Sequence, residues 1–176
     1  HINQASGVSV RASIACLENL ASSAERRGIL TGERRVMARP CDLQHLVAST
    51  RGKIELMLAE DGSASEDKLV HSLVGEAIKV LFDKVADIDA LEPIADQFTK
   101  GLKLTIGDDT SAADTLASLR HVDGLVPAAT RLCKPLKLDP KDDQALACAG
   151  ELVLEALYVH NRISKAISAT GARYSR

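Results

Sequence analysis

Aromatic residues are scarce in this chain of 176 residues, which has two Phe, two Tyr and no Trp. Surfaces that bind single-stranded nucleic acid stack bases on aromatic side chains, and pockets for flat ligands are lined by them. The composition therefore argues against both kinds of site. The core must be built from Leu, Val, Ile and Ala, and such an aliphatic composition favours helices.

An excess of charge is also absent, because 22 Lys and Arg side chains stand against 24 Asp and Glu, a formal net charge of −2. General nucleic-acid binders carry a strong basic excess, so we expect no nucleic acid as a partner. No uninterrupted apolar run approaches the roughly 20 residues of a membrane span, and no secretory leader is visible. These features predict a cytoplasmic protein without a membrane span.

The motifs of common enzyme classes are missing: the sequence has no G-x-G-x-x-G, H-E-x-x-H or G-x-S-x-G. Gly52-Lys53 is similar to the end of a phosphate-binding loop, but Val47 stands where that motif requires Gly and Ile54 where it requires a hydroxyl. The four cysteines, at positions 16, 41, 133 and 148, include no C-x-x-C pair. We expect reduced thiols that hold neither a metal nor a disulfide.

Hydrophobic periodicity predicts an all-α protein with at most a token β-hairpin. Three long segments repeat apolar residues at helical spacing: Val10, Ile14, Leu17, Ala21 and Ala24; Leu69, Leu73, Ala77, Val80, Leu81 and Val85; Leu146, Ala149, Val153, Ala156, Leu157, His160, Ile163 and Ile167. The third helix is expected to end at Gly171, with residues 172–176 frayed. Shorter helices are expected over 42–47, 87–100, 111–121 and 122–132, and a short strand over 102–106.

Few polar residues stand out as candidates for chemistry. Arg11 lies in the first turn of the first predicted helix, where its guanidinium could reach a phosphate or neighbour Glu18 on a solvated face. Glu155 and Arg162 are interpreted as surface or interface charges, because a metal-binding bundle needs a second helix with Glu-x-x-His. His160 lies on an apolar face and is interpreted as a hydrogen-bonded core residue.

An ordered series of short segments occupies both ends of the chain. It comprises Asn3-Gln4, Ser6-Gly7-Val8-Ser9-Val10-Arg11, Asn19, Ala24-Glu25-Arg26-Arg27, Arg39-Pro40, Asp42-Leu43, Ala48-Ser49-Thr50, Gly52-Lys53-Ile54-Glu55-Leu56, Val80-Leu81-Phe82 and the run from Glu151 to Arg162. Taken in this order, the segments resemble the lid and C-terminal region of magnesium chelatase-like AAA+ ATPases. Residues 87–141 resemble the family only in pattern.

The resemblance implies that the chain is the C-terminal portion of a longer ATPase, with Walker A and Walker B motifs upstream in an α/β nucleotide-binding domain. Residues 1–85 would form the helical lid and residues 86–176 a C-terminal helical domain. Arg11 would be the sensor-two arginine that reaches the γ-phosphate of ATP. ATP and Mg²⁺ would bind only to the full-length protein, and this chain alone, which has no catalytic residue, would be inactive.

The resemblance also implies three kinds of partner: the upstream nucleotide-binding domain, neighbouring ATPase subunits in an oligomer, and a protein with a von Willebrand factor A-type domain. ATP hydrolysis would drive remodelling of that partner protein, and insertion of a metal into a tetrapyrrole stays open as the final task. The alternative is a free-standing helical adaptor with no nucleotide role. A G-x-x-x-x-G-K-[ST] motif encoded shortly before His1 would favour the ATPase, and a start codon at Ile2 the adaptor.

Overall fold

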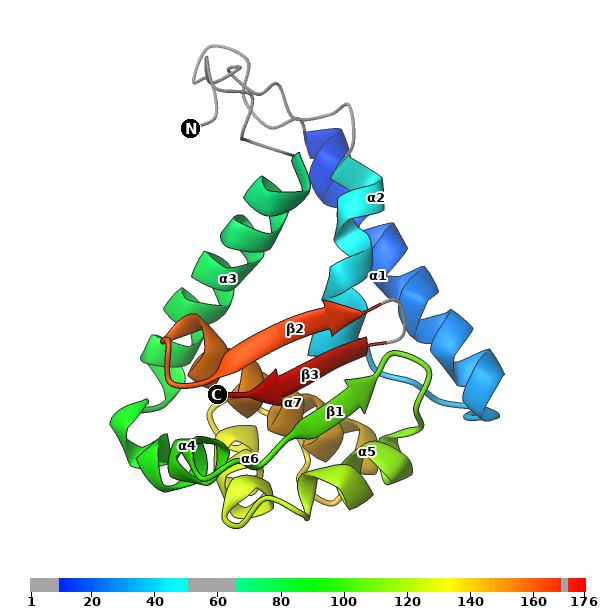
Figure 1. Cartoon of the computed structure of the whole chain (residues 1–176). Coiled ribbons are helices and arrows are strands. Elements are labelled where there is room, and N and C mark those ends of the chain that lie inside the picture. The colour runs from blue at the N-terminus through cyan, green and yellow to red at the C-terminus, as the bar shows by residue number, and fades with distance from the viewer. Residues whose placement is uncertain (1–9, 51–65, 169–170) are drawn as a thin grey trace, which may run out of the picture.

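The computed structural model describes residues 10–50, 66–168 and 171–176, and these form a mainly helical protein with a small three-stranded antiparallel sheet (Figure 1). The helices are α1 (Val10–Thr31), η1 (Pro40–His45), α2 (Leu46–Thr50), α3 (Glu66–Val85), η2 (Asp89–Leu91), α4 (Glu92–Thr99), α5 (Ala112–Leu119), α6 (Leu125–Cys133) and α7 (Asp143–Val159). The strands are β1 (Leu104–Gly107), β2 (Ser164–Ser168) and β3 (Gly171–Ser175). The all-α prediction with a token hairpin is confirmed.

Helix α7 is the centre of the fold. Asp142 caps its N-terminus by accepting a hydrogen bond from the backbone N–H of Gln144, and every residue from Ala149 to Leu157 is buried. A helix that is apolar all round must be covered on all sides, and α3, α5 and α6 pack against it. The core is aliphatic apart from Phe82, Phe98 and Tyr174, as the composition requires.

The C-terminal end of α7 differs from the expectation, because the helix stops at Val159 and the next residues turn back as strands. Asn161 adopts a left-handed conformation with φ of 59°. The N–H of Arg162 bonds to the carbonyl of Leu157, and that of Asn161 to the carbonyl of Tyr158. This is the Schellman arrangement that ends helices, and here Asn takes the position where Gly is most common. The prediction of a helix through Ile167 and a frayed end was therefore wrong.

The sheet has the order β1-β3-β2, with Leu104 opposite Tyr174 and Tyr174 opposite Lys165. The strand predicted around residues 102–106 is confirmed as β1. Gly171 is opposite Gly107 in the pairing of β3 with β1, and a Cβ atom there would be 2.1 Å from the carbonyl oxygen of Ile106. Gly171 also has a φ of 143°, a backbone conformation that residues other than glycine rarely adopt.

Replacing Gly171 with alanine is expected to lower the free energy of unfolding by about 1–3 kcal/mol, because the new Cβ would push β3 away from β1. Gly101→Ala is the matched control. Gly101 also has a positive φ, 99°, but a Cβ there would meet nothing within 4 Å. Chemical denaturation of both variants tests this, and an equal loss for the two would show that the contact with Ile106 is unimportant.

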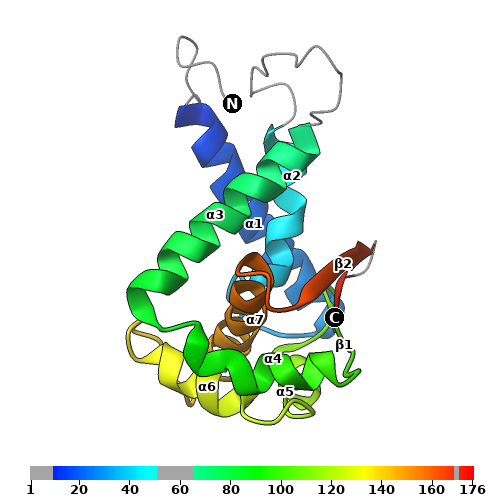
Figure 2. The same ribbon diagram turned by 60° about the vertical axis from the view of Figure 1, so that its left-hand side comes forward.

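Helices α1, α2 and α3 extend from the body that α4–α7 and the sheet form, and this arrangement is clear in both views (Figures 1 and 2). The helix predicted from Val10 onward is confirmed. Its buried side is made of small residues and one arginine: Ala12, Ser23, Ala24, Arg27 and Gly28. The face marked by Ile14, Leu17 and Ala21 is turned outward instead.

Candidate functional site

Arg11 is the second residue of α1, and its side chain is exposed. It lies on the outward side of the helix, where Ile14 and Leu17 are 52% and 67% exposed. Ile14, three positions after Arg11, is its neighbour on the helix surface, whereas Leu17, six positions on, is turned by about 120° from Arg11. The guanidinium therefore borders the apolar residues through Ile14. This end of α1 thus presents one cation beside an apolar strip, the α1 strip (Ile14, Leu17 and Ala21). Residues 6–9, which precede Arg11, lie outside the described part of the chain.

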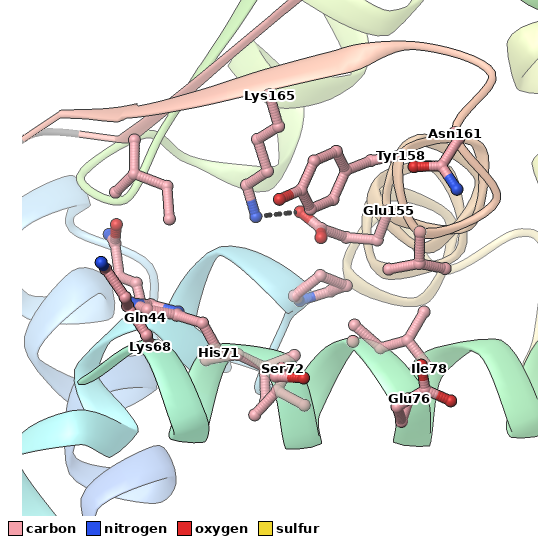
Figure 3. A pocket seen from close by; sticks show the side chains of 16 residues that line it. Gln44, Lys68, His71, Ser72, Glu76, Ile78, Glu155, Tyr158, Asn161 and Lys165 are labelled. Atoms are coloured by element: carbon pink, nitrogen blue, oxygen red, sulfur yellow. Dashed lines mark hydrogen bonds and ion pairs between the residues drawn. The ribbon is translucent and has the colours of Figure 1, made fainter. Parts of the chain in front are cut away.

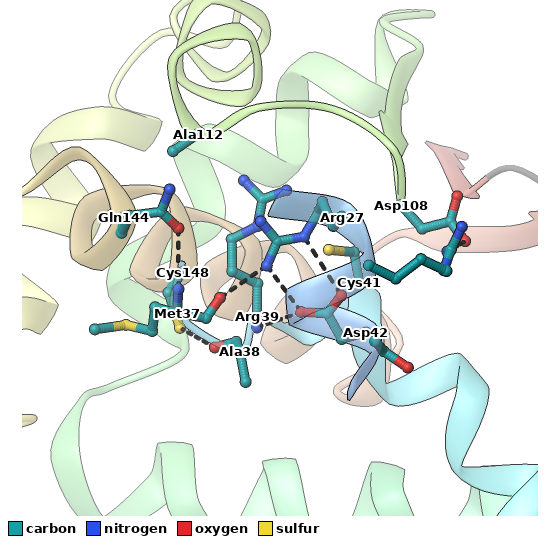
Figure 4. Close-up of polar contacts among 12 residues, drawn as sticks. Arg27, Met37, Ala38, Arg39, Cys41, Asp42, Asp108, Ala112, Gln144 and Cys148 are labelled. Atoms are coloured by element: carbon teal, nitrogen blue, oxygen red, sulfur yellow. Dashed lines mark hydrogen bonds and ion pairs between the residues drawn. The ribbon is translucent and has the colours of Figure 1, made fainter. Parts of the chain in front are cut away.

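The opposite side of α1 is held by a buried ion pair. Arg27 is 0% exposed and Asp42 1%. Arg27 Nη2 lies 3.0 Å from Asp42 Oδ2 and donates a second hydrogen bond of 2.7 Å to the carbonyl of Met37 (Figure 4). Burial by itself would lower the pKa of the Arg27 guanidinium. The hydrogen bond and the charge of Asp42 act in the opposite direction and together outweigh burial, so the pKa is raised. Asp42 therefore fixes a charged arginine, and with it the whole of α1, to η1.

A second buried pair continues from η1 into α7. Arg39 Nε lies 3.3 Å from Glu151 Oε1, and both side chains are at most 1% exposed. The guanidinium also donates to Thr115 Oγ1 at 3.1 Å and to the carbonyl of Thr110 at 2.8 Å, while Glu151 Oε2 accepts the N–H of Cys41 at 2.8 Å. The backbone N–H of Arg39 donates to Asp42 Oδ2 at 2.8 Å, which joins the two pairs. We call Arg27, Asp42, Arg39 and Glu151 the buried charge cluster.

A second link between α1 and the rest of the molecule is Asp108, which follows β1 and is 5% exposed. Its Oδ2 atom lies 3.3 Å from Arg26 Nη2 of α1 and 3.0 Å from both Gln44 Nε2 and His45 Nε2 of η1. Three side chains from two elements thus converge on one oxygen. Together with the buried charge cluster, this contact fixes α1 to the helical body over its second half.

Sequence reasoning missed the buried charge cluster, although one signal was present. Glu151 stands inside the run Ala147-Cys148-Ala149-Gly150-Glu151-Leu152-Val153-Leu154, and a carboxylate in so apolar a helix requires a buried cation. Burial raises the pKa of Glu151, and the nearby Arg39 charge acts in the opposite direction. No local pattern identifies Arg39, which is 112 positions earlier in the chain, as the partner.

The interpretation of Glu155 as a surface charge was wrong. Glu155 is 5% exposed, and its Oε1 lies 2.5 Å from both Lys165 Nζ of β2 and Tyr174 Oη of β3. It therefore fastens the C-terminal hairpin to α7. Arg162 is a half-buried surface charge that pairs with Asp89 and Glu92. His160 agrees with its interpretation, because Nε2 lies 2.9 Å from Asp83 Oδ1 and the ring contacts Phe82 edge-on.

All four cysteines are free thiols, and among the described residues no three His, Cys, Asp or Glu side chains are placed to hold a metal ion. Burial raises the pKa of Cys148 to about 12, with the charge of Glu151 adding to the shift. The pKa of Cys41 is raised above that by the same two causes. Cys148 Sγ lies 3.7 Å from the carbonyl oxygen of Ala38, and the backbone N–H of Cys41 donates to Glu151 Oε2. A thiolate at either position would be repelled by the charge of Glu151.

We expect iodoacetamide at pH 7.5 to alkylate Cys16 on α1 at least about tenfold faster than Cys148, because the thiolate is the reacting form. Residue-resolved mass spectrometry over time measures each rate. The difference should shrink in urea, where the burial that suppresses the Cys148 thiolate is lost. Equal rates in the folded protein would contradict the placement of Cys148, which lies in α7 with its Sγ atom 3.7 Å from the carbonyl oxygen of Ala38.

Comparison with protein-family models, curated protein sequences and solved structures gave no match. Within the described residues, none of the helices has the length and apolar character needed to cross a membrane.

Proposed function

We propose that this chain is the lid and C-terminal region of a cytoplasmic, magnesium chelatase-like AAA+ ATPase. The observation that carries the proposal is the position of Arg11, which the resemblance identifies as the sensor-two arginine. It lies on the outward side of α1, exposed beside an apolar strip and opposite the side that packs on the body. A cation placed in this way can meet a phosphate bound by another domain.

The α1 strip suits contact with the upstream nucleotide-binding domain. Ile14 is the neighbour of Arg11 on the helix surface and Leu17 is the next exposed apolar residue of the strip, and burial of two such side chains would stabilise the contact by about 1.5–3 kcal/mol each. A lid docked in this way would bring the guanidinium to the nucleotide and withdraw it when the lid opens. Binding and hydrolysis would thus depend on lid position.

ATP and Mg²⁺ would be bound mainly upstream. When bound, they supply the phosphoryl group that water attacks and the metal that neutralises its charge. This chain would supply a single bidentate donor, the Arg11 guanidinium, to the charge that develops on the γ-phosphate. An arginine is suited to this role because it is always protonated and its donors are fixed in one plane.

The buried charge cluster gives a route from the nucleotide to the partner. It connects α1 to η1 and η1 to α7, so a movement of α1 would carry α7 with it. In the proposed division, residues 1–85 are the lid and residues 86–176 the C-terminal helical domain. ATP hydrolysis would then be coupled to remodelling of a partner protein with a von Willebrand factor A-type domain, through subunits arranged side by side in an oligomer.

The test compares this chain with the protein encoded by its whole reading frame. We expect the whole protein to hydrolyse ATP, and the 176-residue chain to show neither turnover nor micromolar nucleotide binding in calorimetry. It lacks the backbone cradle and the magnesium ligands that provide most phosphate affinity. A reading frame without a Walker A motif would favour a helical adaptor, and tight nucleotide binding by the isolated chain would contradict the lid assignment.

A further inference from the structure

Two cavities in the described part of the chain differ in how their charges are paired. The larger, of about 480 Å³, lies between β2, η1, α3 and α7, and Lys165 Nζ stands 2.5 Å from Glu155 Oε1 within its wall (Figure 3). The protein itself thus neutralises this ammonium group. The smaller, of about 180 Å³, lies between the end of α3, η2, α6 and α7. Two charged residues line it, Asp87 and Arg131, and neither forms an ion pair with another described residue.

The wall of the smaller cavity is apolar and belongs to the core. Five of the residues that line it, contributed by α3, η2, α6 and α7, are buried: Phe82, Leu91, Ala128, Leu132 and Val153. An engineered cavity of about 150 Å³ lined by Leu, Ile and Phe binds benzene, so a space of this size suits one apolar side chain. Burying a side chain such as that of leucine is worth about 1.5–3 kcal/mol.

Asp87 and Arg131 give this cavity one charge of each sign. Asp87 Oδ1 accepts the N–H of Asp89 at 3.0 Å, which orients the carboxylate and leaves its charge in place. The next two acids along the chain, Asp89 and Glu92, are both paired with Arg162. Arg131 is exposed in the last turn of α6, and a guanidinium can donate two parallel hydrogen bonds to a carboxylate. The cavity therefore offers a partner for an ammonium group and a partner for a carboxylate beside one apolar space.

We propose that this cavity binds a free α-amino acid with an apolar side chain of the size of leucine. Its carboxylate would pair with Arg131, its ammonium group with Asp87, and its side chain would lie against the apolar wall. An apolar acid or an apolar amine would match only one of the two charges and would partly desolvate the other without pairing it. The inference does not depend on the proposed ATPase function, because every residue that lines the cavity belongs to this chain.

The test titrates the isotope-labelled 176-residue chain with L-leucine and follows binding by NMR chemical shifts. Three analogues each lack one part of the ligand: 4-methylpentanoate lacks the ammonium group, 3-methylbutylamine the carboxylate, and glycine the side chain. We expect saturable binding of leucine, and binding at least tenfold weaker for each analogue, because each loses a charge-assisted hydrogen bond or the apolar contact. No saturable binding of leucine, or binding of any analogue as tight as that of leucine, would overturn the inference.

Protein variants locate the binding site. Arg131→Gln and Asp87→Asn each remove one charge, and each should weaken leucine binding at least tenfold. Both side chains are exposed, and Asn can still accept the N–H of Asp89, so the fold should survive, which melting curves check. The matched controls are Arg120→Gln and Asp96→Asn, two exposed residues that do not line the cavity, and both should bind leucine as the unmodified chain does. Undiminished binding in either cavity variant would place the amino acid elsewhere and overturn the inference.

Discussion

Replacing Arg11 with alanine in the intact ATPase is expected to lower the rate of ATP hydrolysis by about 10²–10³, the usual cost of removing one preorganised donor to developing charge. The free energy of unfolding should change by no more than about 0.5 kcal/mol, because the side chain is exposed and fills no core volume. The two effects are separable by measuring steady-state turnover and chemical denaturation on the same preparations.

Two variants serve as controls for Arg11. Arg11→Lys keeps the charge but loses the bidentate geometry, so it should restore only part of the rate. Arg120→Ala removes an exposed arginine of α5 and should leave turnover unchanged. An unchanged rate in Arg11→Ala would reduce Arg11 to a surface charge, and a large loss of stability would make its role structural.

Replacing Asp42 with alanine is expected to lower the free energy of unfolding by about 3–5 kcal/mol, because Arg27 is buried and would lose its hydrogen-bonded carboxylate. Among the described residues, the other carboxylate that pairs with Arg27 is Glu33, whose Oε2 lies 3.8 Å from Nη1. Arg27 has no exposed surface, so water cannot take over the contact. The same change also removes the acceptor for the N–H of Arg39. Urea denaturation followed by circular dichroism measures the loss.

The control for Asp42 separates an unpaired charge from a lost side chain. In the double variant Arg27→Met/Asp42→Leu, no charge is left unpaired, and much of the stability should return. Asp96→Ala, an exposed acid on α4, should cost less than about 0.5 kcal/mol. If the double variant were less stable than Asp42→Ala, the contribution of Arg27 would come from packing and from its bond to Met37 rather than from charge pairing.

Local sequence signals determined most of the helices. Ser111 caps α5 by accepting a hydrogen bond from the N–H of Asp114, and Gly101 follows α4 with a φ of 99°. The periodic apolar residues of α1, α3 and α7 predict where these helices occur along the chain. Such signals act within one or two turns, so they can be found without knowledge of the fold.

Periodicity did not determine which face of a helix is buried. The outward position of Ile14 and Leu17 depends on the packing of α2 against the other side of α1. The C-terminal hairpin likewise lies where a helix was predicted, because α7 ends before Asn161, which has a positive φ, and because β3 pairs with β1. The packing of α2 on α1 and the pairing of β3 with β1 are both contacts with residues outside the segment that carries the helical pattern.

The buried charge cluster depended most completely on tertiary structure. By itself the sequence determined an aliphatic, mainly helical chain and an arginine in the first turn of α1. Only the fold brought Arg39 to Glu151, across more than half the chain, and Arg27 to Asp42. The physical reason is that a buried charge requires a partner in space, and spatial neighbours so distant in sequence leave no periodic pattern.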